Sequence, residues 1–279
     1  MNPIIPIPTA HLFPILDQKL EHLLQALSPE QWELSTIVPK WNIRKIACHL
    51  LDTNIRTLSV LRDDHLGSPP EAIHSYQDLI GYLNRLNADW ITATQRLSPA
   101  LLIDLLIHTG KQCNKYWEEL PPFEPARFGV AWAGQEESPN WFHMAREYTE
   151  KWHHQQQIRL AVGETDVLYA QALYFPHLET SMQALPHHYR NIEAPTGTSL
   201  AFTVSGVEGG TWYLERLDSS WEIIPTPQGR PDCHVHIPGE IAWRLFTKGI
   251  SHAEAAPLLT ISGQKALGSP ILNMLAVMA

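Results

Sequence analysis

The sequence has no run of basic residues, no long apolar stretch and only three cysteines in 279 residues. Its formal net charge is −9, whereas proteins that bind nucleic acid phosphates depend on clustered Lys and Arg, so we expect no nucleic acid partner. No apolar stretch approaches the ~20 residues of a membrane-spanning helix, so we expect no membrane contact. Residues 1–10 lack the basic region and apolar core of a signal peptide. The sequence therefore predicts a cytoplasmic protein.

The cysteines Cys48, Cys113 and Cys233 lie far apart, without a Cys-x-x-Cys pair. This spacing argues against both a disulfide framework and a thiolate zinc site. Histidine, in contrast, occurs 15 times and is concentrated in short stretches. The spacing of the histidines is therefore the most informative chemical feature of the chain.

The length predicts two domains, and the pattern of apolar residues changes near residue 195. Apolar residues with the period of an amphipathic helix predict helices over 11–27, 42–62, 75–97, 98–117 and 138–162. Asn42 and Ser75 are expected caps, and Gly163 an expected stop. We interpret residues 1–165 as a four-helix-type bundle and residues 166–194 as a helical linker.

Residues 195–279 are predicted to form a small α+β domain. Alternating, β-branched and aromatic residues predict strands over 199–204, 211–217, 221–224 and 233–237, in a small antiparallel sheet. Helical patterns follow at 240–248, 252–259 and 270–278. The overall expectation is a multidomain protein of α and α+β class.

The helix over 138–162 carries a polar stripe that includes Glu150 and His154. Residues four apart lie about 40° apart around a helix, so the carboxylate and the imidazole can bind the same ion. Arg146 and Gln157 belong to the same stripe. An exposed Glu-x-x-x-His pair is common, so this spacing by itself is weak evidence for a metal site.

A third ligand is expected from another helix, because bundle cores assemble metal sites from inward side chains. His49 lies in an otherwise apolar helix, and we predict that it joins Glu150 and His154. Three protein ligands leave a fourth position open, which is typical of catalytic zinc. His153 points about 100° away from His154, which favours only His154 as a ligand.

A second histidine pair, His234 and His236, lies on one face of a predicted strand. The pair could bind a metal, but the sequence suggests no third ligand. The favoured interpretation is that both are surface polar residues.

Several motifs together resemble the mycothiol-dependent maleylpyruvate isomerase family, a branch of the DinB-like metal-binding bundles. They are Leu27-Ser28-Pro29-Glu30-Gln31-Trp32, Trp41-Asn42-Ile43-Arg44, His49-Leu50-Leu51-Asp52 and Glu150-x-x-x-His154. The C-terminal part, with its closing 261–268 motif, resembles a sterol-carrier-like domain. Gln157 stands where many relatives have Asp, and the loop 128–134 has no counterpart that we can place.

The resemblance implies a metal-dependent enzyme that uses a mycothiol-like low-molecular-weight thiol for isomerisation or S-transfer. Its site would be His49, Glu150 and His154, with Asp52, Arg56, Arg127, Arg146 and Gln157 as supporting or substrate-binding residues. Zinc suits these ligands best, although nickel, iron or manganese also fits. The partners would be this thiol and a small, anionic electrophile, and the protein a monomer or homodimer. The alternatives are a non-catalytic metal-binding or stress-response protein and a metal-dependent hydrolase.

Overall fold

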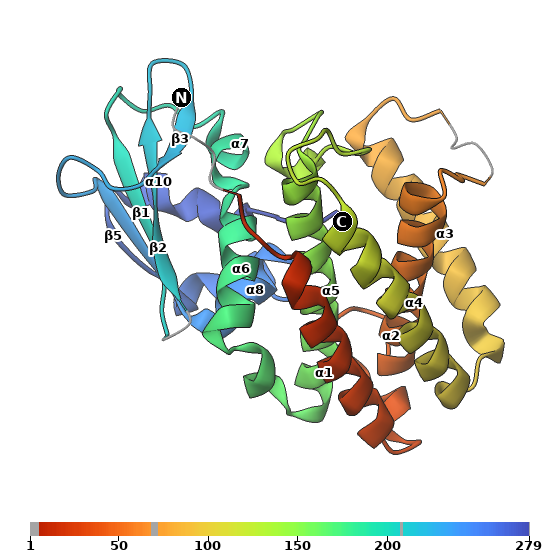
Figure 1. Cartoon of the computed structure of the whole chain (residues 1–279). Coiled ribbons are helices and arrows are strands. Elements are labelled where there is room, and N and C mark those ends of the chain that lie inside the picture. The colour runs from red at the N-terminus through yellow and green to blue at the C-terminus, as the bar shows by residue number, and fades with distance from the viewer. Residues whose placement is uncertain (1–5, 68–71, 207–208, 279) are drawn as a thin grey trace.

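The computed structural model describes residues 6–67, 72–206 and 209–278. The chain forms a helical part over residues 13–189, followed by a part built on a mixed five-stranded sheet (Figure 1). The expected order of a helical bundle and an α+β region is confirmed. Residues 1–5 and 68–71 lie outside the described residues.

Five long helices form the bundle, as the apolar pattern predicted. They are α1 (Phe13–Ala26), α2 (Ile43–Arg56), α3 (Tyr76–Ala93), α4 (Pro99–Glu119) and α5 (Asn140–Val162). Asn42 caps α2, since its side chain accepts a hydrogen bond from the Lys45 amide at 3.0 Å, and Ser75 caps α3 in the same way. Gly163 ends α5 in the left-handed conformation, where glycine is favoured. The predicted caps and stop are therefore confirmed.

The helix that carries His49, α2, is followed directly by a turn of a different helical type. After Arg56 the chain continues in a π-helical turn, Thr57–Arg62, so the predicted helix over 42–62 has two forms. Short 3₁₀ turns complete the bundle at Ala10–Leu12, Gln31–Glu33, Thr94–Arg96 and Ala131–Ala133.

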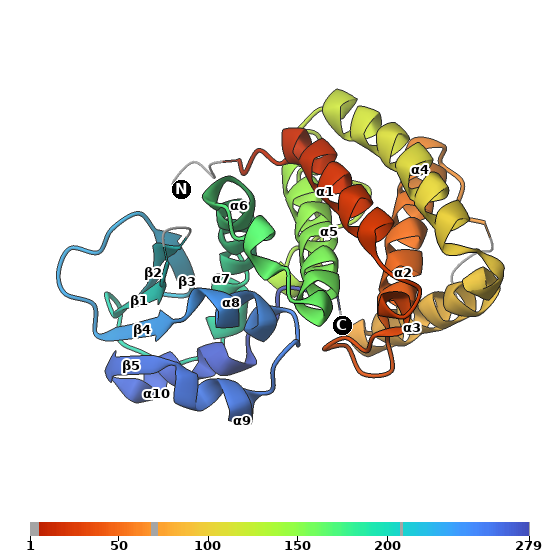
Figure 2. The ribbon, with the colours of Figure 1, turned by 90° about the horizontal axis from the view of Figure 1, so that it is seen from below.

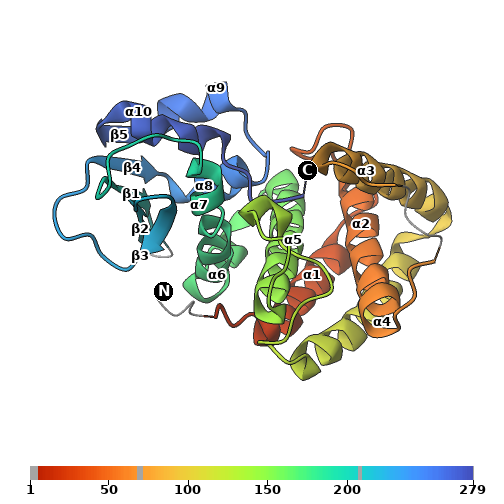
Figure 3. The same cartoon turned by 90° about the horizontal axis from the view of Figure 1, so that it is seen from above.

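Two helices connect the bundle to the sheet: α6 (Gln171–Met182) and α7 (Leu185–Tyr189), after a 3₁₀ turn at Thr165–Leu168. In Figures 2 and 3, α6 lies between α5 and the sheet. The segment expected to be a linker is thus a packed layer between the two parts.

The sheet has the strand order β3-β2-β1-β4-β5. The strands are β1 (Ser199–Val204), β2 (Gly210–Arg216), β3 (Trp221–Ile224), β4 (Cys233–Ile237) and β5 (Thr260–Gly263). The four predicted strands are confirmed, and β5 is an addition. The expected antiparallel sheet is wrong in one respect: β1 pairs with β4 in parallel, so the sheet is mixed. The long connection through β2 and β3 allows β4 to run in the same direction as β1.

The last part of the chain contains α8 (Gly239–Phe246), α9 (His252–Ala255), α10 (Lys265–Gly268) and 3₁₀ turns at Ala256–Leu258 and Ser269–Asn273. The helix predicted over 270–278 is wrong, because only its first residues form a 3₁₀ turn. Beyond it, the Ala276 amide donates to the Phe246 carbonyl of α8 at 2.9 Å instead of to its own helix. This final segment runs back toward the bundle beside α5 (Figures 2 and 3).

The two parts share one hydrophobic core, in which aromatic rings from both are in contact. Trp152 of α5 stacks on Tyr174 of α6, with centroids 4.9 Å apart, and lies 6.0 Å from Trp243 of α8. The Trp243 indole donates to the Tyr169 hydroxyl at 2.9 Å. Removing so much apolar surface from water holds the two parts in one arrangement.

None of the helices that the structure describes is both long and apolar enough to cross a membrane.

The Tyr169 hydroxyl should matter for stability. We expect Tyr169→Phe to lower the free energy of unfolding by about 1–3 kcal/mol, because the buried Trp243 N–H loses its acceptor. Urea denaturation followed by Trp fluorescence measures this change. The matched control is Tyr213→Phe, since the Tyr213 hydroxyl makes no hydrogen bond among the described residues. Equal stability of the two variants would contradict the assigned role of Tyr169.

Candidate metal centre

Helix α5 is buried on nearly all sides, although much of its sequence is polar. The buried polar residues of this helix are Asn140, His143, Thr149, Lys151, His153, Gln155, Gln156, Gln157 and Arg159. A buried polar group without a hydrogen-bond partner is costly, so these side chains are held in place by the partners they find. The candidate metal site is built on this helix.

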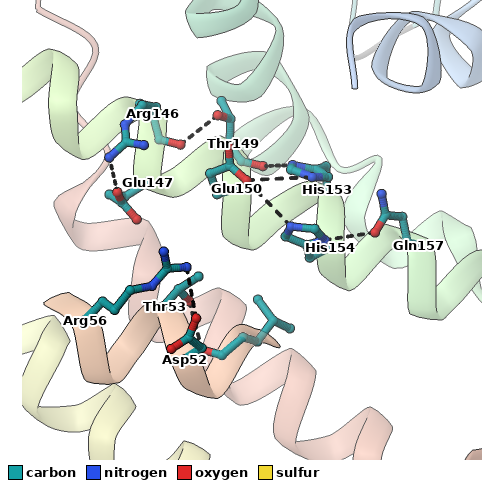
Figure 4. Close-up of polar contacts among 11 residues, drawn as sticks. Asp52, Thr53, Arg56, Arg146, Glu147, Thr149, Glu150, His153, His154 and Gln157 are labelled. Carbon is teal, nitrogen blue, oxygen red and sulfur yellow. Dashed lines mark hydrogen bonds and ion pairs between the residues drawn. The ribbon is translucent and has the colours of Figure 1, made fainter. Parts of the chain in front are cut away.

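Glu150 and two histidines of α5 converge at one point (Figure 4). Glu150 Oε2 lies 3.6 Å from His154 Nε2 and 3.9 Å from His153 Nε2. The ligand atoms of these three residues all lie within 4.8 Å of one another. This group is therefore able to hold a metal ion.

His49 of α2 faces the same group. Its ring centroid lies 4.7 Å from that of His154 and 5.3 Å from that of Trp41. The side chains predicted as ligands from distant parts of the sequence are thus neighbours. We call His49, Glu150, His153 and His154 the His/Glu cluster.

His153 belongs to this cluster, although helical geometry favoured only His154. The rings of the two adjacent histidines lie 4.1 Å apart. Each Nε2 atom reaches the same carboxylate, because Glu150 precedes them by three and four residues and lies between their directions. In the sequence, the feature that could have identified His153 as part of the cluster was its position three residues after Glu150.

Hydrogen bonds fix both imidazoles on α5. His153 Nδ1 lies 2.8 Å from the Thr149 carbonyl oxygen, which can only accept, so Nδ1 carries the proton. His154 Nδ1 lies 2.9 Å from Gln157 Oε1 and donates to it in the same way. Each Nε2 therefore presents a lone pair to the cluster. Metal-binding histidines are usually oriented by such a bond from their other ring nitrogen.

Burial keeps the three imidazoles uncharged. Burial lowers the pKa of His153 to about 4, and burial together with the charge of His153 lowers the pKa of His154 to about 3. For His49, burial and then His154 hold the pKa well below its usual value. Burial also raises the pKa of Glu150. Neutral imidazoles are the form that binds a metal ion.

Two buried polar atoms of the cluster have no hydrogen-bond partner among the described residues. Glu150 Oε1 and His49 Nδ1 are both buried and make no hydrogen bond there. A cation would supply the missing interaction for a carboxylate and an imidazole at once. The donor set of one carboxylate and neutral imidazoles therefore fits a divalent transition metal.

Two ion pairs, each of an arginine and a carboxylate, lie beside the cluster. Arg56 pairs with Asp52 at 3.1 Å, and Arg146 pairs with Glu147. Arg56 extends from α2 toward α5 (Figure 4). The predicted supporting residues Asp52, Arg56 and Arg146 therefore lie beside the cluster, and Gln157 contacts it directly.

Glu147 was not singled out in the sequence, yet it is the second carboxylate of this region. Burial raises its pKa, but the charges of Arg146, His143, Arg56 and Lys151 outweigh this effect, and the net result is a lowered pKa. Glu147 therefore stays ionised and balances the arginines. Its position one turn before Glu150 was the signal that could have identified it.

Arg127 lies elsewhere. It pairs with Asp64 and lies over the Phe128 ring at 5.9 Å, and no described contact connects it with the cluster. The loop over 128–134 is anchored by the buried Val130 and Trp132. A Cβ atom on Gly134 would lie 2.1 Å from His187 Nδ1, so this glycine lets the loop pack directly on α7.

His177 of α6 is a buried histidine behind the cluster. Its ring stacks on Trp152, with centroids 4.4 Å apart, and both of its nitrogens lack a partner among the described residues. Burial, and then the charge of His153, hold the pKa of His177 well below its usual value. Its role in the structure is therefore that of a neutral, stacked ring.

The chain is similar to known proteins in sequence and in fold. Residues 13–159 match the family described as "Mycothiol maleylpyruvate isomerase N-terminal domain". The structure is similar to crystal structures of the mycothiol-dependent maleylpyruvate isomerase and of a histidine-to-alanine mutant of it, each with a TM-score of 0.54 and 12% sequence identity. Each match covers 92% of this chain and 93% of the other. No curated protein matches the sequence.

The stacked position of His177 predicts a pH effect. The folded protein keeps His177 neutral, whereas the unfolded chain takes up a proton below about pH 6.5, so its contribution to stability is lost as the pH falls. We expect His177→Phe, which keeps the stacking, to reduce the loss of stability between pH 7 and pH 5. The reduction is at most ~1.4 kcal/mol per pH unit.

Urea midpoints of the wild type and the variant at both pH values measure this effect. The exposed His108 supplies the control variant, His108→Gln, measured at the same two pH values. The same loss of stability in wild type and His177→Phe would show that His177 is not held neutral.

Proposed function

Because the chain belongs to the mycothiol maleylpyruvate isomerase family, we propose that it is a metal-dependent enzyme that activates a low-molecular-weight thiol. The thiol would add to a small, anionic electrophile, with isomerisation or S-transfer as the outcome. The observation that carries the proposal is the convergence of His49, Glu150 and His154 from two helices.

In this proposal His49, Glu150 and His154 hold a divalent transition metal, zinc being the best match to imidazole and carboxylate ligands. When bound, the metal would lower the pKa of a coordinated thiol so that it reacts as a thiolate. Gln157 keeps the His154 ring in the orientation that presents Nε2. The surrounding burial excludes water, which strengthens electrostatic interactions at the site.

The arginines beside the cluster support an anionic substrate. The side chain of Arg56 is 34% exposed, so part of its guanidinium is accessible although it pairs with Asp52. Arg146 Nε is buried and has no partner among the described residues. A carboxylate on the substrate would satisfy these free N–H donors, as guanidinium groups usually do.

A second candidate function rests on His153. If its Nε2 binds the metal together with the other three residues, the site has four protein ligands, which is the closed pattern of structural zinc. The protein would then bind metal without catalysing the thiol reaction. The distance of 3.9 Å from His153 Nε2 to Glu150 Oε2 favours this alternative.

The metal content of the purified protein tests the site itself. We expect about one equivalent of transition metal by mass spectrometry, and a 10- to 100-fold or greater loss of affinity in His154→Ala. The matched control is His236→Ala, because His236 is exposed on β4, with its ring 3.9 Å from that of the half-buried His234. Metal lost equally in both variants, or absent from the wild type, would contradict the proposed site.

Thiol binding separates the two candidate functions. We expect N-acetylcysteine to produce a thiolate-to-metal absorption band with the Co²⁺-loaded wild type, whereas its S-methyl thioether should not. No band with the wild type, but a band with Co²⁺-loaded His153→Ala, would favour the closed, non-catalytic site.

A further inference from the structure

A cavity lies in the bundle, away from the His/Glu cluster. It has a volume of about 340 Å³ and is lined by residues of α1, α2, α4 and α5. Its apolar wall consists of Leu20, Leu24, Leu50, Ile103, Leu106 and Ile107. No residue of the cluster lines it; Leu50 and Lys151 are instead the sequence neighbours of His49 and Glu150. The cavity therefore lies on a different side of α2 and α5 from the cluster.

One end of the cavity is polar and built around an ion pair between the buried Lys151 and the half-buried Asp17. Lys151 is only 7% exposed, and its Nζ lies 2.5 Å from Asp17 Oδ1. Asn114 donates to the other carboxylate oxygen, Asp17 Oδ2, at 2.9 Å. All three residues line the cavity. Because removing charges from water is costly, such an ion pair is weak evidence for a purely stabilising role.

Gly110 of α4 makes room for this ion pair. A Cβ atom on Gly110 would lie 2.9 Å from Asp17 Oδ2, so any other residue would displace the carboxylate. Glycine inside a helix costs about 1 kcal/mol relative to alanine. The sequence thus keeps an unfavourable residue where it preserves the polar end of the cavity.

At the polar end of the cavity, the Lys151 ammonium can donate further hydrogen bonds and the Asn114 side-chain oxygen can accept one. The bond to Asp17 is the only hydrogen bond of Lys151 Nζ to the described residues, so other N–H donors of the ammonium remain. Asn114 Oδ1 is buried and has no partner there. The charges of Lys151 and Asp17 cancel, and the other two charged residues that line the cavity, Lys111 and Glu21, are also of opposite sign. A hydroxyl group can accept from the ammonium and donate to the amide oxygen, whereas a charged group would meet the like charge of one of the pair.

We infer that this cavity is a second ligand site, independent of the metal, for a small amphipathic molecule with an uncharged hydroxyl head and a hydrocarbon body. Such a site has the usual character of small-molecule pockets, an apolar wall with a few convergent polar groups. The hydrocarbon would lie against the leucine and isoleucine wall, and the hydroxyl between Lys151 and Asn114.

Binding of octan-1-ol tests this inference, with octanoate and octylammonium as probes of equal chain length. We expect the wild type to bind the alcohol at least about tenfold more tightly than either ion, as measured by isothermal titration calorimetry. Ile107→Trp should abolish binding by filling the cavity, and Ile103→Trp provides a second filling variant if the first does not fold. His154→Ala should bind octan-1-ol like the wild type, because the cluster does not contribute to this site.

No binding of octan-1-ol to the wild type would overturn the inference, as would binding that persists in a folded filling variant. Equal affinity for octanoate would overturn the assignment of an uncharged head group. Octan-1-ol binding does not involve the His/Glu cluster, so its absence would not contradict the proposed metal-dependent function. In the same way, absence of metal from the protein would not contradict the proposed octan-1-ol site.

Discussion

The polar side chains of α5 are buried, and the rest of the structure depends on satisfying them. Gln156 donates to the Thr165 carbonyl at 3.0 Å, and Arg159 donates to the Lys19 carbonyl at 2.9 Å. Lys151 pairs with Asp17 of α1, so two different segments, α1 and the turn at Thr165, provide partners for one helix. Because an unpaired buried group costs more than a hydrogen bond gains, these contacts fix both the rotation of α5 and the positions of its neighbours.

The same removal of water prepares the candidate metal centre. Burial keeps the imidazoles of the His/Glu cluster neutral and leaves Glu150 Oε1 without a partner. The aromatic layer of Trp152, Tyr174 and His177 closes the side of α5 that faces the α+β part. Trp243 of α8 lies 6.0 Å from Trp152, so the α+β part contributes to the surroundings of this layer although none of its residues belongs to the cluster.

The sequence predicted the elements best where one local signal dominated. The helices of the bundle followed from apolar spacing and from the caps Asn42 and Ser75, and four strands followed from alternation. The parallel pairing of β1 with β4 is a long-range contact that no local pattern encodes. The helix expected over 270–278 failed because tertiary contacts, such as the bond from Ala276 to Phe246, outweighed local propensity.

For the candidate site, the helical period and the family resemblance together predicted His49, Glu150 and His154 as one set. The same period failed for His153, because it describes where a side chain leaves the helix and not how far its ring reaches. Arg127 was placed near the site by its position in the sequence, but loop geometry directs it to Asp64. Long, flexible side chains on loops are the residues whose neighbours a sequence defines least.

The continuous core between the two parts has an evolutionary consequence. A gene fusion could join another C-terminal region to this bundle. Unless that region carried a matching aromatic surface, the fusion would expose Trp152, Tyr174 and the buried His177. Exposed aromatic surface of this kind promotes aggregation. Recombination is therefore restricted to exchanges that preserve the aromatic contacts between the two parts. The two parts are expected to have been inherited together.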